Sequence, residues 1–74
     1  MTFKSGDMVW VIFSDHSMNF GKLLSCEVAG WVRECNDEFI TIDSWRTEDQ
    51  DAETESFTIG WAMIQFAYKI YIKD

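Results

Sequence analysis

The sequence predicts an all-β fold, a small five-stranded barrel with a strongly bent second strand and one short helical turn. Apolar side chains recur at every second position in several stretches, which is the period of a β-strand. Short turn-forming segments separate these stretches, and 74 residues suffice for one domain spanning residues 1–74. Because closure removes the exposed edges of a sheet, we expect a barrel.

The first strand is expected over residues 6–14, a nearly continuous apolar run with β-branched and aromatic residues. Such a run is typical of a strand that is covered on both faces. Residues 15–19 are polar except for one Met, and we expect them to form a loop.

The second strand is expected over residues 22–35, where Leu24, Cys26 and Val28 alternate with polar or small side chains. Gly30 interrupts this alternation. A glycine inside a strand marks a bulge or a sharp bend, so the pattern predicts one long strand bent at Gly30.

A turn at residues 36–37 leads into a third strand that begins at residue 39 and runs into Asp43 and Trp45. Ile40 and Ile42 lie on one face of this strand. Residues 46–55 contain nothing to bury and are predicted to form an acidic, solvated loop or an extension of the flanking strands into water.

A short fourth strand is expected over residues 56–59, followed by a single helical turn over 61–64. The last strand has the clearest alternation in the chain, with apolar or aromatic side chains on one predicted face. These are Ile64, Phe66, Tyr68, Ile70 and Ile72.

The order of these features resembles the SH3-like and Sm-like small barrels. The resembling parts are the opening GDMVWV, the long strand bent at Gly30, the hairpin WVRECNDEFITIDSW and the segment TIGWAMI. The resemblance implies the architecture. It does not extend to the Sm-type nucleotide-binding residues, and the six Lys and Arg residues are scattered along the chain.

The negative charge is concentrated in one part of the sequence. The chain has a net charge of −7, and residues 34–55 contain nine Asp or Glu and one Arg. Such a surface repels nucleic-acid phosphates and anionic membranes and attracts basic grooves. We therefore expect a larger protein with a basic groove as partner, with neither direct nucleic-acid binding nor a membrane. A homodimer would help to stabilise so small a core.

The acidic loop provides the candidate binding site. In an extended segment, residues two apart project from one face about 6.8 Å apart, close to twice the ~3.4 Å rise per nucleotide of a duplex strand. The acidic residues of the hairpin turn, Glu34, Asp37 and Glu38, are expected to continue the same anionic edge. The candidate partner-binding residues are Asp43, Trp45, Glu48, Asp49, Asp51, Glu53 and Glu55.

The aromatic residues divide between core and surface. We expect Phe13, Phe39 and Phe66 to lie in the core. Trp45, and with it Trp31, is expected to be partly exposed beside the charged edge, where an aromatic anchor with a charged rim is typical of a protein-binding hot spot.

Catalytic and metal-binding patterns are weak. His16 has Asp15 and Ser17 beside it, but adjacent loop residues do not adopt the geometry of a catalytic triad, so we expect no catalytic residues and no cofactor. Cys26 and Cys35 lack the spacing and the histidines of a zinc site. Counted from Asp49, a calcium loop would need Gly and Glu at positions held by Thr54 and Gly60.

In size and charge the chain is similar to phage-encoded acidic inhibitors, the anti-CRISPR proteins and other DNA mimics. That resemblance implies a non-enzymatic inhibitor that occupies the nucleic-acid channel of a larger protein in the cytoplasm, the host cytoplasm if the chain is phage-encoded. Three alternatives remain: an SH3-like or Sm-like module that binds nucleic acid or forms a ring, an adaptor for basic peptides, and an acidic run that only keeps the protein soluble.

Overall fold

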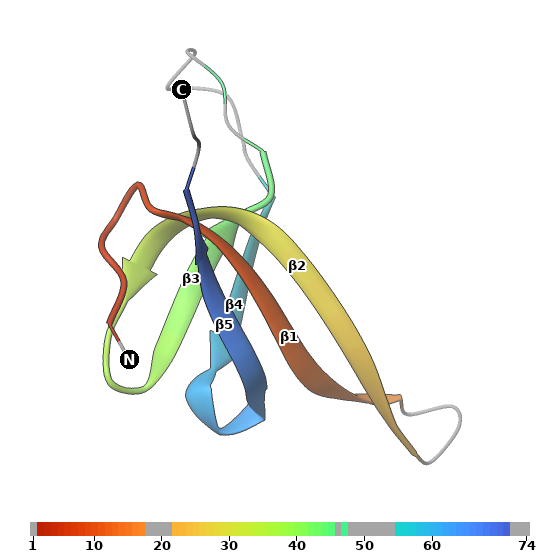
Figure 1. Ribbon diagram of the computed structural model, residues 1–74. Helices are drawn as coiled ribbons and strands as arrows, with labels where there is room; N and C mark the ends of the chain where they lie inside the picture. Colours follow the sequence, from red (N-terminus) through yellow and green to blue (C-terminus); the bar gives the residue numbers. More distant parts are fainter. Residues whose placement is uncertain (1, 18–21, 46, 48–54, 72–74) are drawn as a thin grey trace.

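A computed structural model describes residues 2–17, 22–45, 47 and 55–71, which form a single sheet of five antiparallel strands (Figure 1). The all-β class, the five strands and the short helical turn are confirmed. The elements are β1 (Met8–Ser17), β2 (Lys22–Cys35), β3 (Phe39–Asp43), β4 (Ser56–Gly60), the 3₁₀ turn η1 (Trp61–Met63) and β5 (Ile64–Ile70).

The strand order is β4-β3-β2-β1-β5, so β4 and β5 form the two edges. Within the described residues no ladder joins these edges, and the sheet is therefore open, in contrast to the expected closure. A groove of about 460 Å³ lies between β4 and Phe13–Asp15 of β1.

Strand β1 is longer than the sequence predicts. Residues 15–17, which were expected in a loop, pair with residues 22–24 of β2 in the same register as the rest of the hairpin. The ladder is formed by backbone groups, so polar side chains do not end it. The remaining loop positions, 18–19, lie outside the described residues. Beyond Phe13 β1 pairs only with β2, and Figure 1 shows this hairpin projecting past the other strands.

The core lies on one face of the curved sheet. Its fully buried side chains come from β1, β2 and β3, with a contribution from the N-terminal segment and from β4. The buried residues are Phe3, Val9, Val11, Val32, Ile40, Ile42 and Ile59. Phe13, Val28, Trp61, Ile64 and Ala67 are among the partly buried side chains that pack against them.

Strand β2 changes partner at Gly30 and Trp31. Residues 22–31 pair with β1, and from Trp31 onward β2 pairs with β3. Figure 1 shows β2 arching across the molecule as a long curved strand. A β-carbon on Gly30 would overlap the backbone carbonyl oxygen of Asp43 on β3. The glycine thus permits β3 to approach β2 closely, at the position where the sequence pattern predicted a bend in the strand.

One face of β1 is buried, whereas the opposite face is partly exposed. Val9 and Val11 have no exposed surface, whereas Trp10, which points to the opposite face, is 40% exposed. The prediction that both faces are covered is wrong, because the described residues form one sheet and provide no second layer over the outer face.

A β-bulge in β5 reverses the side-chain alternation. Ile12 pairs with Phe66, but the next residue of β1, Phe13, pairs with Ile64, so Gln65 is an extra residue in β5. As a result Ile64 and Ala67 pack toward the core, while Phe66 is 55% exposed. The expected core position of Phe66, and the shared face of Ile64 with Phe66, are therefore wrong.

The N-terminal segment is attached to the outgoing half of β2. The backbone N–H of Gly6 donates to the carbonyl of Val32, and the N–H of Val32 donates to the carbonyl of Asp7, both at 2.8 Å. The Asp7 carboxylate accepts the backbone N–H of Lys4 at 3.0 Å and lies 3.4 Å from Lys69 Nζ. The Lys4 hydrogen bond, helped by Lys69 and opposed by desolvation, holds the pKa of Asp7 below its ordinary value of 3.8.

Candidate functional site

The described residues of the predicted acidic site, Asp43, Trp45 and Glu55, lie where β3 ends and just before β4 begins. There the backbone N–H of Ser44 donates to the carbonyl of Glu55 at 3.1 Å, which closes the base of the loop. Trp45 is 44% exposed and Glu55 is exposed. The partial exposure expected for Trp45 is therefore confirmed. The other loop acids of the predicted site, Glu48, Asp49, Asp51 and Glu53, lie outside the described residues.

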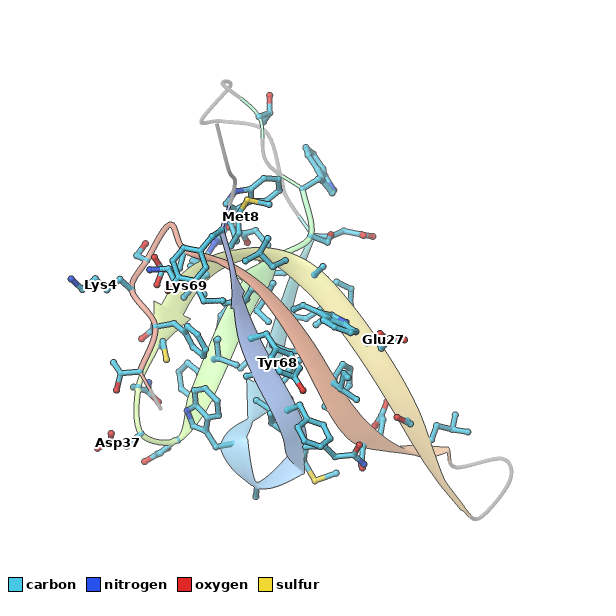
Figure 2. The ribbon with its side chains drawn as sticks, viewed as in Figure 1. Lys4, Met8, Glu27, Asp37, Tyr68 and Lys69 are labelled. Carbon is cyan, nitrogen blue, oxygen red and sulfur yellow. The ribbon has the colours of Figure 1, made fainter. Side chains whose placement is uncertain are left out.

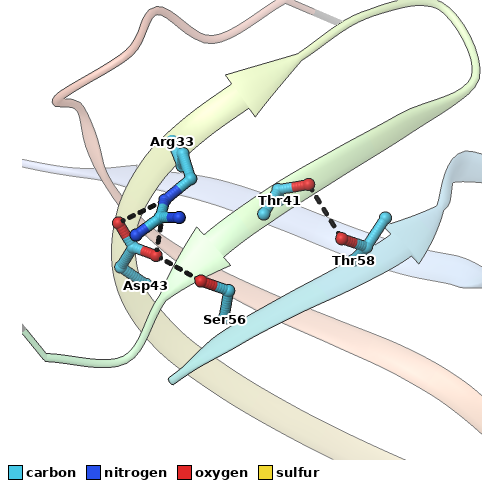
Figure 3. Close-up of polar contacts among 5 residues, drawn as sticks. All are labelled: Arg33, Thr41, Asp43, Ser56 and Thr58. Carbon is cyan, nitrogen blue, oxygen red and sulfur yellow. Dashed lines mark hydrogen bonds and ion pairs between the residues drawn. The ribbon is translucent and has the colours of Figure 1, made fainter. Parts of the chain in front are cut away.

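Asp43 is held within the sheet (Figure 3). Its Oδ1 lies 3.0 Å from Arg33 Nε and accepts the hydroxyl of Ser56 at 2.7 Å, and its Oδ2 accepts the Nε–H of Arg33 at 3.1 Å. The side chain is only 15% exposed. These contacts tie together β2, β3 and β4, so the Asp43 carboxylate stabilises the base of the loop and offers less free charge than Glu55.

The acidic hairpin turn lies at the other end of β3. Asp37 and Glu38 are exposed and precede β3, whereas Glu55 follows the loop that leaves the opposite end of the strand. The Asn36 side chain fixes this turn, because its Oδ1 accepts the N–H groups of Glu38 and Phe39 at 2.8 and 2.9 Å. The acidic residues of the hairpin turn, Asp37 and Glu38, are therefore at the opposite end of β3 from Glu55 and do not adjoin it.

A second surface was not identified from the sequence. Trp10 on β1 pairs directly with Tyr68 on β5, and Phe66 stands two residues before Tyr68. The ring centroids of Trp10 and Tyr68 are 5.4 Å apart, and those of Phe66 and Tyr68 are 6.1 Å apart. All three side chains are at least 40% exposed. We call Trp10, Phe66 and Tyr68 the outer aromatic face.

A carboxylate borders the outer aromatic face. Trp10 Nε1–H donates to Glu27 Oε1 at 2.9 Å, and Glu27 is exposed. Figure 2 shows Tyr68 and Glu27 on either side of β1. The strand order explains this placement, because β1 lies between β5 and β2. The face is thus built from two strands, β1 and β5, and has an anionic rim on β2.

The sequence signals for this face were ambiguous. Trp10 lies in a run that is apolar at consecutive positions, so its pattern does not indicate which face is buried. Phe66 and Tyr68 belong to a regular alternation whose inner residue in the structure is the small Ala67. One signal was available. When one face of a strand carries large side chains and the other carries only an alanine and polar residues, the alternation does not decide which face is buried.

The two cysteines are free thiols. Cys26 and Cys35 are nine residues apart on β2, roughly 30 Å along the strand. In the parts of the chain that the structure covers, no group of three or more His, Cys, Asp or Glu side chains is arranged to hold a metal ion.

Comparison with known proteins found no match: no family model, no curated protein and no solved structure is significantly similar to this chain. None of the helical structure in residues 2–17, 22–45, 47 and 55–71 is long and apolar enough to span a bilayer.

Proposed function

We propose that this protein is a non-enzymatic binding module, an acidic inhibitor that occupies the basic nucleic-acid-binding groove of a larger protein. The observation that carries the proposal is the charge distribution. Residues 34–55 contain nine of the thirteen acidic residues of the chain and one of its six basic residues. A basic groove that binds phosphates attracts such a concentration of negative charge.

The structure supports the loop as the contact region in two ways. Trp45 is exposed where the loop leaves β3, and exposed Trp residues are common anchors of protein interfaces. The loop base is also rigidly attached, through the Ser44–Glu55 backbone bond and the Asp43–Arg33 and Asp43–Ser56 contacts. A fixed base reduces the entropy that is lost when the loop binds.

The architecture is consistent with this type of protein. We infer an SH3-like arrangement, because the long curved β2 shared by two partners and the 3₁₀ turn before β5 match the features that suggested this fold. A small rigid β-scaffold that presents one charged loop suits an anti-CRISPR or other DNA-mimicking protein of a phage, acting in the host cytoplasm.

The test is capture of the target from lysate with the immobilised protein, elution along a salt gradient, and competition by duplex DNA. We expect a nucleic-acid-binding protein that elutes as salt screens the contact and that DNA displaces. The triple variant Asp49→Lys, Asp51→Lys, Glu53→Lys should no longer capture this target.

The control is a second triple reversal with the same net charge, Asp15→Lys, Asp37→Lys, Glu38→Lys, at exposed positions away from the loop. It should retain capture. Equal loss of capture in both variants would show that only the total charge matters. Equal retention of capture in both would show that the loop is not part of the interface.

The open edges of the sheet favour a second candidate function, an Sm-like module that assembles into a ring. Within the described residues β4 and β5 each have one unpaired edge, and such edges pair readily with another chain. A ring would be several times heavier than 8.7 kDa by light scattering and would bind an oligonucleotide at physiological salt.

A further inference from the structure

We infer that the outer aromatic face, together with Glu27, binds a cationic side chain of the partner, with the guanidinium of arginine as the preferred group. The inference rests on the proposed function for the basic character of the partner. It adds a second contact surface, on β1, β2 and β5, to the loop between β3 and β4.

The rings of this face touch one another and remain accessible. The exposed fractions are 40% for Trp10, 55% for Phe66 and 46% for Tyr68. Single exposed aromatic residues are normal, but here Tyr68 contacts both Trp10 and Phe66, and such a joined patch is typical of a surface that contacts another molecule. Ala29 on β2 pairs with Trp10, is exposed and has only a methyl side chain, so it leaves that side of the patch open.

The charge of Glu27 determines which ligand the patch favours. Its Oε1 accepts the Trp10 indole N–H, which fixes the carboxylate beside the ring. Among the described residues no Lys or Arg forms an ion pair with Glu27. The negative charge at the edge of the rings is therefore available to a cation from outside.

Aromatic faces attract cations through their quadrupole. A guanidinium group is planar, so it can stack on a ring while its N–H groups donate to a carboxylate. The ammonium of lysine is more strongly hydrated and makes less of the ring contact. Arginine thus matches both parts of the site.

The same combination already occurs within the protein. Lys69 Nζ lies 3.4 Å from Asp7 Oδ1 and 5.2 Å from the centroid of the Tyr71 ring. One cation is therefore held between a carboxylate and an aromatic face in this fold. The outer aromatic face offers the equivalent groups to a cation of the partner.

The experiment follows the indole N–H signals of ¹⁵N-labelled protein by NMR during titration with a hexa-arginine peptide. Each Trp reports on its own surroundings: Trp10 on the outer aromatic face and Trp45 on the acidic loop. We expect both signals to shift saturably. Titration of the Trp10 signal with hexa-lysine should give an affinity at least about 3-fold weaker than that of hexa-arginine.

Two variants test the site. Glu27→Gln removes the charge but keeps an oxygen that can accept the Trp10 indole N–H, so it should weaken the response of Trp10 about 3- to 10-fold without altering the fold. Tyr68→Ala removes one exposed ring and should weaken it about 2- to 5-fold. The control Glu38→Gln makes the same charge change at the hairpin turn and should leave the Trp10 response unchanged.

The outcomes separate this inference from the proposed function. A shift of Trp45 alone would overturn the inference and leave the loop as the binding site. A Trp10 response that is identical in Glu27→Gln would also overturn it. A thymidine oligonucleotide that shifts Trp10 where hexa-arginine does not would identify a base-stacking surface, and a Trp10 shift caused by dilution alone would identify a contact between copies. If neither Trp10 nor Trp45 responds, both proposals lose their electrostatic basis.

Discussion

At Gly30 the backbone of β2 approaches β3 so closely that there is no room for a side chain. A β-carbon at this position would overlap the carbonyl oxygen of Asp43, which is a backbone atom and cannot rotate away. We expect Gly30→Ala to lower the free energy of unfolding by about 1–3 kcal/mol, as overpacking does elsewhere. Urea unfolding followed by Trp fluorescence measures the change.

Gly60 provides the matched control for this substitution. It also lies in extended backbone, but a β-carbon there would lie 3.8 Å from the carbonyl oxygen of Glu38, an ordinary van der Waals distance. Gly60→Ala should therefore leave stability within about 0.5 kcal/mol. If both alanine variants were equally stable, close packing at Gly30 would not explain the path of β2.

Asp7 links stability to acid pH. The Lys4 N–H, followed by the charge of Lys69, lowers the pKa of this carboxyl below 3.8 in the folded protein, against the opposing effect of desolvation. Its contribution to stability is therefore present above the ordinary pKa of 3.8 and is lost as the pH falls through the lower, folded value. Wild type should be more stable than Asp7→Asn at neutral pH.

This difference should shrink between about pH 5 and pH 2 as the carboxylate becomes protonated. Thermal unfolding of both proteins by circular dichroism over this range measures it. Other carboxylates titrate in the same range, but they are common to both proteins, so the difference isolates Asp7. A difference that stays constant with pH would mean that the carboxylate charge has no part in attaching the N-terminal segment.

The bulge in β5 decides which side chains reach the core. Without Gln65 the strand would pair with β1 residue for residue, with Ile64 opposite Phe13 and Phe66 opposite Ile12 as they are now. We expect deletion of Gln65 to be tolerated, with a loss of about 0.5–1.5 kcal/mol for its 2.6 Å hydrogen bond to Ser14.

Deletion of Ala67 should have a much larger effect. It shifts the register of β5 by one residue on one side of the deletion, which brings Phe66 or Tyr68 to the place of a methyl group at the core. We expect loss of the cooperative unfolding transition. Comparable stability of the two deletion variants would show that the bulge does not set the side-chain orientation of β5.

The element boundaries show where sequence patterns are informative. The limits of β2, residues 22–35, are confirmed, because the alternation and the flanking turn residues mark both ends. The end of β1 was predicted too early, since the polar residues 15–17 continue the hairpin through backbone pairing. Side-chain polarity describes burial, whereas the length of a hairpin depends on the partner strand.

The whole molecule combines a high negative charge with two unpaired strand edges. At neutral pH a net charge of −7 opposes the approach of a second copy to the edges of β4 and β5. We expect light scattering to give the monomer mass of 8.7 kDa at pH 7. The mass should increase as the pH approaches the isoelectric point of about 4.4, where the repulsion disappears.

Salt offers an independent check of this explanation. At pH 7 high salt screens the repulsion and should also increase the mass. A constant monomer mass under both conditions would show that charge is not what keeps the edges apart. A larger assembly at pH 7 and low salt would instead favour the ring-forming function.

The sequence by itself determined the strand periods, the turn at Asn36, the bend at Gly30 and the acidic composition of residues 34–55, because each depends on neighbouring residues only. The tertiary structure decided that Phe66 and Trp10 are exposed, that Ala67 faces the core, and that Asp37 and Glu38 lie at the other end of β3 from Glu55. The physical reason is that alternation assigns side chains to two faces but does not say which face is buried. That depends on which strands lie side by side and on a single extra residue, Gln65, in the ladder between them.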